Sequence, residues 1–341
     1  MQKTPTIRDV AREAKVSVAV VSRVLNDGTG PVAPDTRSRV LHVIEELGYQ
    51  PRAAARELQS GDTTTVGLVL ADLTNPFFAR LADRVVWEAR ARGTQVLLST
   101  TQEDPLVEAE ALDTLIGRGV AAVIATPTSE NVEKWQRLRR RGIHVVFVDR
   151  SIEELPDIDV VSLNNAASAQ IATEHLIGLG HTRIAFLSGP TRTSTGHSRI
   201  AGFRTAMAEA ELPVDERLVH AIPFRGEAGS DAVGALLALD DAPTALVVGN
   251  TAQAHNALRR LHQASVAIPR DLSVIVFDDS PWTELVSPPL SVIRQPIEML
   301  AMHSMDLVLA RIRGTITDTV RRVRLDADFI ERSSTAPRDP S

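Results

Sequence analysis

The stretch that decides the fold lies near the N-terminus and reads TIRDVAREAKVSVAVVSRVLND (6–27), followed by TRSRVLHVIEELGYQPRAAAREL (36–58). Val10, Ala11 and Ala14 share one face at helical spacing, which predicts a helix over residues 7–14. The next three residues interrupt it, and Ser17 is well placed to cap a second helix over residues 18–25. Two short helices joined by a tight turn form a helix-turn-helix, whose second helix fits a DNA major groove.

A third helix is predicted over residues 35–47, where Val40, Ile44 and Leu47 repeat at core spacing. Ala33 stands at its cap position and offers no side-chain acceptor, a loss of about 1 kcal/mol. Residues 51–58 are too short for a helix that is stable alone in water. Residues 61–65 then form a polar linker.

From Val66 onward, apolar strand-like runs alternate with helical stretches. The runs cover residues 66–72, 95–100, 121–126, 144–149, 183–189, 244–250 and 272–278, and helices are predicted at 77–92, 108–118, 167–179, 200–210, 252–262 and 296–313. This alternation indicates parallel sheets that are covered on both faces, with too many strands for one small sheet. The predicted fold class is α + α/β, a helix-turn-helix head followed by doubly wound parallel sheets.

Composition is typical of a globular protein of more than one domain, with 341 residues that are 43% hydrophobic and 23% charged. The chain has no cysteine, which excludes disulfides, thiolate metal sites and a cysteine nucleophile. Its first residues lack the apolar core of a signal peptide, and no apolar run is long enough to cross a membrane. We therefore expect no membrane partner and a cytoplasmic location.

The net charge of −6 is unevenly distributed. Residues 1–60 contain nine Lys/Arg and seven Asp/Glu, a net charge of +2. Residues 61–341 contain 28 Lys/Arg and 36 Asp/Glu, a net charge of −8. A mildly basic head on an acidic body places any DNA contact in the head. Affinity for DNA should then depend on charge placement and dimerisation more than on bulk attraction.

Short motifs follow one another in the head: IRDVA (7–11), VS (16–17), VSRVLN (21–26), TR (36–37), LGYQP (47–51) and AREL (55–58). In this order, at the start of a long α/β chain, they resemble the lactose/galactose repressor (LacI/GalR) family of bacterial transcriptional regulators. The resemblance continues to about Ser334. It implies two subdomains of periplasmic-binding-protein type joined by three crossovers, near residues 163, 291–293 and 318.

This resemblance divides the chain as follows. Residues 1–50 form the helix-turn-helix head, and residues 51–65 form a hinge helix and linker. Residues 66–163 plus 291–318 form the first effector-binding subdomain, and residues 164–290 plus 319–331 form the second. Residues 332–341 are rich in serine and proline, so we expect a disordered tail, and without leucine heptads the tail offers no basis for a coiled-coil tetramer.

The resemblance also assigns DNA contacts. Arg23 is the main candidate for reading a base, since arginine can bond guanine in a bidentate way, although a solvated charge or a phosphate contact is the simpler alternative. Val18 and Ala19 occupy the other reading positions, and Arg8 can reach a base or a phosphate. Ser17, Ser22, Asn26, Thr36 and Arg37 match phosphate-contacting positions, and Ala55 and Leu58 match the hinge helix. In the family this leucine wedges into the minor groove; the alternative is that Leu58 packs on the body. Val20 replaces the usual threonine, which should weaken binding.

Effector-binding candidates follow strand ends or lie in adjoining loops, since doubly wound sheets bind ligands beyond the carboxyl ends of their strands. They are Phe77, Phe78, Asp149, Thr195, Arg199, Phe224, Asn250, Asp278 and Trp282. Several also rest on the resemblance, because DLTNPFF (72–78), GPTRTSTGHSRIAGF (189–203) and the acidic position 278 are similar to family segments. Arg199 is the strongest, because a guanidinium offers five donors in a fixed fork. The alternatives are helix caps, internal salt bridges and an Arg199–Asp278 pair. Two departures from the family pattern, Asn250-Thr251 and Asn164-Asn165, put one hydroxyl contact or cap in doubt.

We therefore predict a homodimeric regulator, most simply a repressor at the nucleoid, that binds double-stranded operator DNA under the control of a small-molecule effector. A neutral polyhydroxylated ring such as a sugar suits the candidate residues slightly better than a polyanion. A periplasmic-type binding protein without DNA function is the alternative, which the head argues against. The sequence has no G-x-G-x-x-G after the first strand, no P-loop and no metal-ligand cluster, so we expect no cofactor, no metal and no enzyme.

Overall fold

The structure is a computed structural model that describes residues 5–25, 32–49, 64–317 and 319–338. The chain divides into two compact units, Met1–Thr64 and Thr65–Ser341. Within the described residues, no helix combines the length and the apolar character that a membrane crossing requires.

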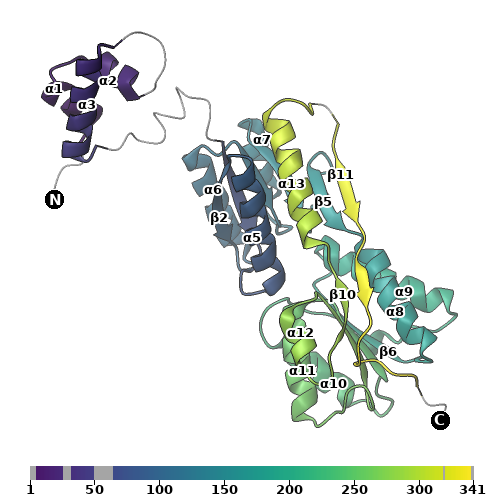
Figure 1. Cartoon of the computed structure of the whole chain (residues 1–341). Helices are drawn as coiled ribbons and strands as arrows, with labels where there is room; N and C mark the ends of the chain where they lie inside the picture. The colour runs from purple at the N-terminus through teal and green to yellow at the C-terminus, as the bar shows by residue number, and fades with distance from the viewer. Residues whose placement is uncertain (1–4, 26–31, 50–63, 318, 339–341) are drawn as a thin grey trace. The chain divides into compact units, whose positions relative to one another are not determined.

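The head is a bundle of three helices, α1 (Ile7–Glu13), α2 (Val18–Leu25) and α3 (Pro34–Leu47) (Figure 1). Helix α1 begins with a capping box, in which Asp9 accepts hydrogen bonds from both the backbone nitrogen and the hydroxyl of Thr6. The predicted cap of α2 is present, because the Ser17 hydroxyl accepts a bond from the Val20 nitrogen at 3.3 Å. Helix α3 has no side-chain cap at Ala33, as predicted.

The head core is built from small apolar residues: Val10, Ala11, Ala14, Val21, Val24, Val40 and Val43 are buried. One prediction for this core is wrong. Leu47 is 36% exposed, because it lies in the last turn of α3, at the end of the helix. Val43 takes the buried position instead, one helical turn after Val40.

The first subdomain of the body has a six-stranded sheet in the order β11-β5-β4-β3-β1-β2, with every neighbouring pair parallel. Its strands are β1 (Thr65–Leu70), β2 (Gln95–Thr100), β3 (Ala122–Ala125), β4 (His144–Val148), β5 (Asp159–Leu163) and β11 (Arg322–Leu325). Its helices are α5 (Pro76–Ala91), α6 (Pro105–Arg118), α7 (Val132–Arg140) and α13 (Ile297–Ile312).

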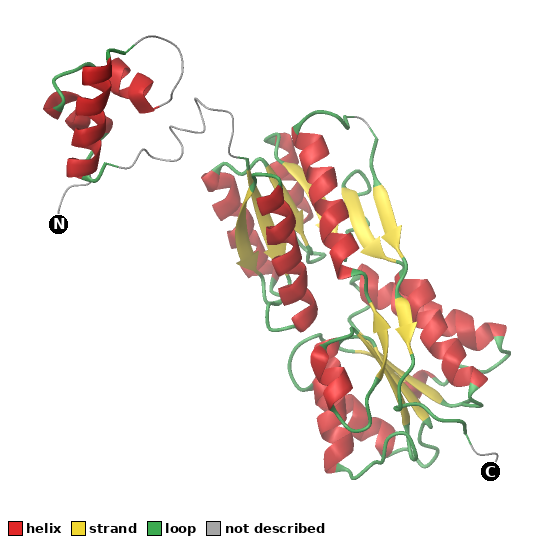
Figure 2. Cartoon of the chain, in the orientation of Figure 1, coloured by secondary structure: helices red, strands yellow, loops and turns green. Residues whose placement is uncertain are grey.

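Alternate residues of the central strands face opposite helical layers. Val66 and Leu68 of β1 are in one core cluster with α5 and α13, and Val69 is in another with α6 and α7. The sheet is therefore doubly wound, with helices on both faces (Figure 2). At Gly67 the helix α6 approaches closely, since a Cβ there would lie 2.7 Å from the Leu115 side chain.

The second subdomain repeats this plan with the order β12-β10-β9-β8-β6-β7, in which only β10 and β12 pair antiparallel. Its strands are β6 (Ile184–Ser188), β7 (Val219–Ala221), β8 (Ala245–Val248), β9 (Ser273–Phe277), β10 (Ser291–Arg294) and β12 (Asp328–Ile330). Helices α8 (Asn165–Gly178) and α9 (Ser194–Glu209) cover one face, α10 (Ala228–Leu237) and α11 (Thr251–Gln263) the other, and α12 (Pro281–Leu285) follows β9.

Two predicted segment assignments are wrong. Residues 291–294 do not belong to the first subdomain, because they form β10, which is buried beside β9 in the second sheet. Residues 319–325 do not belong to the second, because β11 pairs with β5 at the edge of the first sheet. The chain crosses between the subdomains after β5, between β10 and α13, and between β11 and β12. The first of these matches the prediction, and α13 lies in the first subdomain as expected.

The expected disorder of the tail is also wrong over residues 332–338. Ser334 is fully buried, accepts a bond from the Ser291 nitrogen at 2.7 Å and donates one to the Val274 carbonyl at 2.6 Å. Further along, the Arg338 nitrogen donates to the Leu179 carbonyl at 2.7 Å. Polar contacts with the ends of buried strands fix this segment despite its composition. Residues 339–341 lie outside the described part of the chain.

Candidate effector cleft and DNA-reading helix

Two buried aspartates stand at the carboxyl ends of strands in different subdomains. Asp149 follows β4 and Asp278 follows β9, and each is 5% exposed. Both have a positive φ, +69° and +79°, a conformation that aspartate tolerates better than most residues but that still costs energy. The two strand ends therefore present carboxylates that are held in strained backbone, a feature that is frequent at ligand sites.

Arg199 of α9 is a buried arginine on which the charges of both aspartates act. It is 4% exposed, and both Asp149 and Asp278 stabilise its charge. Its Nε donates to Asn165 at 2.8 Å and its Nη1 donates to the Gly249 carbonyl. The guanidinium also stacks on the Phe277 ring, 4.2 Å from the centroid.

The alternative of a direct Arg199–Asp278 salt bridge is not realised among the described residues. Asp278 is instead held by two neutral donors, the Thr251 hydroxyl at 2.8 Å and the Gln295 amide at 2.6 Å. The carboxylate is thus oriented without being neutralised, which leaves its remaining lone pairs for other donors.

The charge state of Asp149 reflects its burial. Loss of solvent raises the pKa of this carboxyl to about 6, although Arg150 and Arg199 act in the opposite direction. Burial lowers the pKa of Arg199, and Asp149 and Asp278 oppose that shift. A carboxyl that titrates near neutrality beside a buried arginine is typical of a ligand site.

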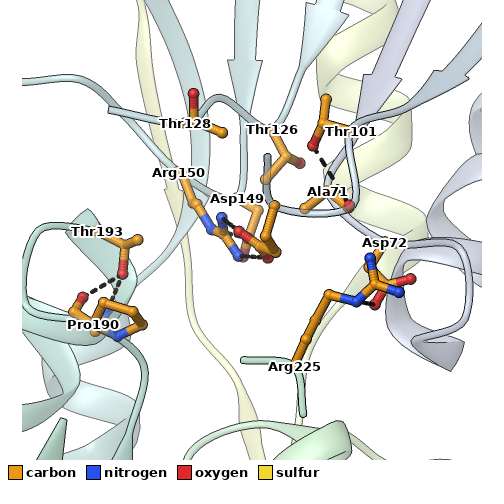
Figure 3. A network of polar contacts seen from close by, with 12 residues as sticks. Ala71, Asp72, Thr101, Thr126, Thr128, Asp149, Arg150, Pro190, Thr193 and Arg225 are labelled. Carbon is orange, nitrogen blue, oxygen red and sulfur yellow. Dashed lines mark hydrogen bonds and ion pairs between the residues drawn. The ribbon is translucent and has the colours of Figure 1, made fainter. Parts of the chain in front are cut away.

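Arg150 is a cleft residue that the sequence reasoning missed. It is 3% exposed and forms a bidentate ion pair with Glu103, with both nitrogen–oxygen distances at 2.7 Å. Its guanidinium lies 4.6 Å from the Phe224 ring centroid and 6.0 Å from that of Phe78. Figure 3 shows Arg150 beside Asp149, between the subdomains. Arg150 thus joins two aromatic candidates that come from different subdomains.

Several buried polar atoms near the cleft have no hydrogen-bond partner in the described structure. They are Nε of Arg150, Oγ1 of Thr195, Oε1 of Gln253 and Oε1 of Gln295. Buried polar groups are nearly always paired in native proteins, so these four atoms have capacity for a further hydrogen bond.

Two cavities open beside this cluster. One of about 290 Å³ is lined by Phe77, Asp278 and Gln295, together with Ser280 and Arg294. The other, of about 380 Å³, is lined by Asp149, Ser151 and Asn165, with Ser194 and Ser198 from the start of α9. The predicted residues Phe77, Asp149 and Asp278 therefore do line cavities between the subdomains.

The remaining predicted residues have other surroundings. Asn250 caps α11, accepting bonds from the nitrogens of Ala252 and Gln253 at 2.8 and 3.4 Å. Trp282 lines neither of the two cavities; it packs on His255 with ring centroids 4.4 Å apart, against the core of the second subdomain. Phe77 packs edge-on against Phe78 at 5.0 Å. In the described ranges, no group of three acidic or histidine side chains could hold a metal ion.

The head presents a partly exposed reading helix. Ser17, Val18 and Ala19 are exposed at its N-terminus, while Arg23 is half-buried and its Nε donates to the Ala19 carbonyl at 3.3 Å. Arg8 is exposed on α1, and Ser22, Thr36 and Arg37 are half-buried. The predicted contacts Asn26, Ala55 and Leu58 lie outside the described residues.

Two family models match this chain. Bacterial regulatory proteins of the lacI family match residues 6–52, and a periplasmic binding protein-like domain matches residues 173–335. The transcriptional regulator DegA of Bacillus subtilis is 32% identical over 335 residues, which cover 97% of this chain and 98% of DegA. The chain belongs to the LacI family of DNA-binding transcriptional repressors.

Solved LacI-family structures share this fold. A regulator from Enterococcus faecium with bound ribose is 27% identical, with a TM-score of 0.71 over 81% of this chain and 100% of its own. The regulator CelR in complex with cellobiose is 29% identical, with a TM-score of 0.73 over 97% of this chain and 99% of its own.

The two departures from the usual LacI-family pattern have compensating partners. Thr251 stands where an aspartate is usual, and its hydroxyl donates to the Asp278 carboxylate. An aspartate at position 251 would instead repel Asp278. At the first crossover, Asn165 orients Arg199, and Asn164 bonds Asp326 of another crossover at 3.1 Å. The cap at Asn250 that was in doubt is present.

Proposed function

We propose that this LacI-family chain is a dimeric repressor whose operator affinity is controlled by a neutral sugar bound between the two subdomains. The observation that carries the proposal is the pair of buried strand-end carboxylates, Asp149 and Asp278, whose charges both act on the buried Arg199. Carboxylates accept bonds from sugar hydroxyls and an arginine donates to them, so a ring with several hydroxyls suits this set of groups.

The charge arrangement favours a neutral ligand over a sugar phosphate. Each cleft arginine already has an acceptor: Arg150 has Glu103, Arg225 has Asp72, and Arg199 has Asn165 and a carbonyl. A phosphate would have to compete with these partners while lying close to carboxylates. Aromatic faces such as Phe78 and Phe224 suit the apolar face of a sugar ring. The cavities of about 290 and 380 Å³ suit a monosaccharide.

Calorimetric titration of the full chain with D-ribose, cellobiose, D-ribose 5-phosphate and adenosine tests this assignment. The first two are the classes bound by the two solved relatives. We expect a neutral monosaccharide to bind and the phosphate to bind at least tenfold more weakly, a difference of about 1.4 kcal/mol. Tighter binding of the phosphate or of adenosine would overturn the neutral-sugar assignment.

The proposed operator contacts are those of the reading helix and of α1 and α3. Arg23 reads a guanine, Val18 and Ala19 contact thymine methyls, and Arg8, Ser17, Ser22, Thr36 and Arg37 hold the backbone. We also predict operator contacts for Asn26, Ala55 and Leu58. Selection from a randomised duplex pool, with and without the bound sugar, should enrich a near-palindrome whose retention changes with sugar. Absence of any enriched sequence would contradict the operator assignment.

The proposed dimer uses an apolar surface on the first subdomain. Leu97 and Leu98 are 39% and 43% exposed on β2, the edge strand of the first sheet, and Val86 and Trp87 are 44% and 57% exposed on α5. An exposed edge strand with apolar side chains is a ready surface for a second copy. Such a dimer matches a palindromic operator, since half-site symmetry mirrors protein symmetry. We propose that this repressor works at the nucleoid, where its operator lies. We assign it no catalytic role.

A further inference from the structure

One loop of the second subdomain reaches across the cleft, and we call residues 222–227 the bridging loop. It lies between β7 and α10. Phe224 of this loop lies under the Arg150 guanidinium of the first subdomain. The next residue, Arg225, pairs with Asp72 at 3.2 Å and donates to the Gln102 carbonyl at 3.1 Å (Figure 3). Adjacent residues thus supply an aromatic wall and an ionic contact across the same opening.

The bridging loop is attached firmly to its own subdomain. The Gln253 amide, at the start of α11, donates to the carbonyls of Ile222 and Pro223 at 3.2 and 3.3 Å. Asn256 donates to the Gly226 carbonyl at 2.6 Å. A Cβ at Gly189 would lie 2.0 Å from the Phe224 ring, so the strand end after β6 is in close contact with the loop. The loop therefore moves with the second subdomain.

The acceptors of Arg225 are attached equally firmly to the first subdomain. One carboxylate oxygen of Asp72 accepts hydrogen bonds from the backbone nitrogen and the hydroxyl of Thr74, at 2.9 and 2.7 Å. The other oxygen faces Arg225. Gln102 has a φ of +55°, in a tight turn whose next residue bonds the Ala71 carbonyl. Both acceptors are thus fixed where β1 and β2 end, and opening of the cleft must separate them from Arg225.

Two ion pairs join the subdomains among the described residues, and the Arg225–Asp72 pair is the better protected from solvent. The side chains of Arg225 and Asp72 are 38% and 9% exposed, whereas those of the Arg192–Glu130 pair are 64% and 44% exposed. Solvent screens the second pair more strongly, so the first should contribute more to closure.

We propose that Arg225 and Asp72 form a latch that holds the cleft closed over its ligand and sets how long the ligand stays bound. The latch rests on the proposed function, because it regulates that same site. Arg225 is a positioning residue in this scheme: it acts through Asp72, and it places Phe224 over Arg150. Ligand escape then requires the pair to separate, so its loss should appear in the dissociation rate.

The test on the sugar site compares Arg225→Gln, Asp72→Asn and the double variant in the full chain, with D-ribose as probe. We expect each single variant to dissociate about tenfold faster with an association rate within about twofold, and the double variant to match the singles. Arg225→Lys keeps the ion pair, so its dissociation rate should lie between those of the parent and of Arg225→Gln. The matched control is Arg204→Gln, which removes an ion pair inside the second subdomain. Additive effects in the double variant, or an unchanged dissociation rate, would overturn the latch.

A second measurement does not depend on the ligand. Because the chain has no cysteine, Arg118→Cys in the first subdomain and Asp240→Cys in the second allow two dyes to be attached for energy transfer. Without ligand, Arg225→Gln should lengthen the mean dye separation and Arg204→Gln should not. If no sugar binds but this shift occurs, the latch stands and the proposed ligand is wrong. If sugar binds and the separation is the same in both variants, the latch is wrong.

Discussion

Asp149 holds a carboxyl whose burial raises its pKa to about 6, so at neutral pH the folded protein contains a desolvated charge. A carboxyl with a raised folded-state pKa destabilises the fold as pH rises from about 4, its ordinary range, through 6. The Asp149→Asn variant removes that charge. We expect it to be more stable than the parent near pH 8 by up to about 3 kcal/mol, with the difference gone near pH 4.

Thermal melting across this pH range measures the effect, and Asp83→Asn, an exposed carboxylate on α5, is the control that should change little. The same variant should bind the sugar more weakly near pH 8, because an amide nitrogen replaces an accepting oxygen. A variant that is less stable than the parent at every pH would show that Asp149 serves mainly as a structural anion.

Arg23 is the residue that the recognition proposal depends on most. The Arg23→Ala variant should lose roughly 1–3 kcal/mol of discrimination at one base in each half-site and keep its non-specific, salt-dependent binding. Competition between a selected operator and mutated duplexes measures this preference.

Arg12→Ala is the matched control for this prediction, since Arg12 lies on α1 and pairs with Asp9. It should leave the base preference unchanged. If Arg23→Ala keeps the full preference of the parent, Arg23 contacts phosphate or solvent instead of a base.

At the scale of single residues, the sequence predicted the cleft residues that directly follow strands. It did not predict the cleft residues whose burial depends on partners far away in the sequence. Asp149 and Asp278 were found because parallel strands present their carboxyl ends at one edge. Arg150 was missed because a charged residue after a strand looks solvated. Its burial depends on Glu103, 47 positions earlier, and on Phe224 from the other subdomain.

At the scale of elements, the long helices and the buried central strands were predictable. The strands β5, β7, β10, β11 and β12 and the helices α7 and α10 were not predicted, and neither was the membership of β10 and β11 in their sheets. Periodicity placed strands such as β2 and helices such as α5 within a residue or so, because apolar spacing is a local property. The strands β10 and β11 were assigned to the wrong subdomains, since either short segment could extend either sheet. The choice is made by pairing with β9 and β5, contacts that no local pattern records.

The edge strand β2 provides a prediction for the dimer. Leu98→Asp places a charge in the middle of the proposed interface, and we expect the dimer to weaken by about 2 kcal/mol, roughly thirtyfold in its dissociation constant. Sedimentation velocity over a range of concentrations measures the shift.

Ile171→Asp is the control for this prediction, because Ile171 is comparably exposed, at 40%, but lies on α8 of the second subdomain. It should leave the dimer intact. A Leu98→Asp protein with the parent's association would direct attention to another surface, such as the exposed Leu285 on α12.

At the scale of the whole molecule, head and body are separate compact units, each with a core of its own. The cleft residues Asp149, Arg199 and Asp278 all lie in the body. Ligand binding without DNA should therefore need only residues 65–341, and its coupling to DNA should need the full chain.

The final prediction compares these two forms by calorimetry. Residues 65–341 should bind D-ribose with the same affinity as the full chain, within about twofold, and adding operator DNA should change only the full chain's affinity. By linkage, the factor by which operator changes sugar affinity must equal the factor by which sugar changes operator affinity, and 5–150-fold is typical. An operator with a scrambled half-site is the control. A factor of one, with both ligands bound, would mean that the cleft does not control the head, and that the sugar serves another purpose in this protein.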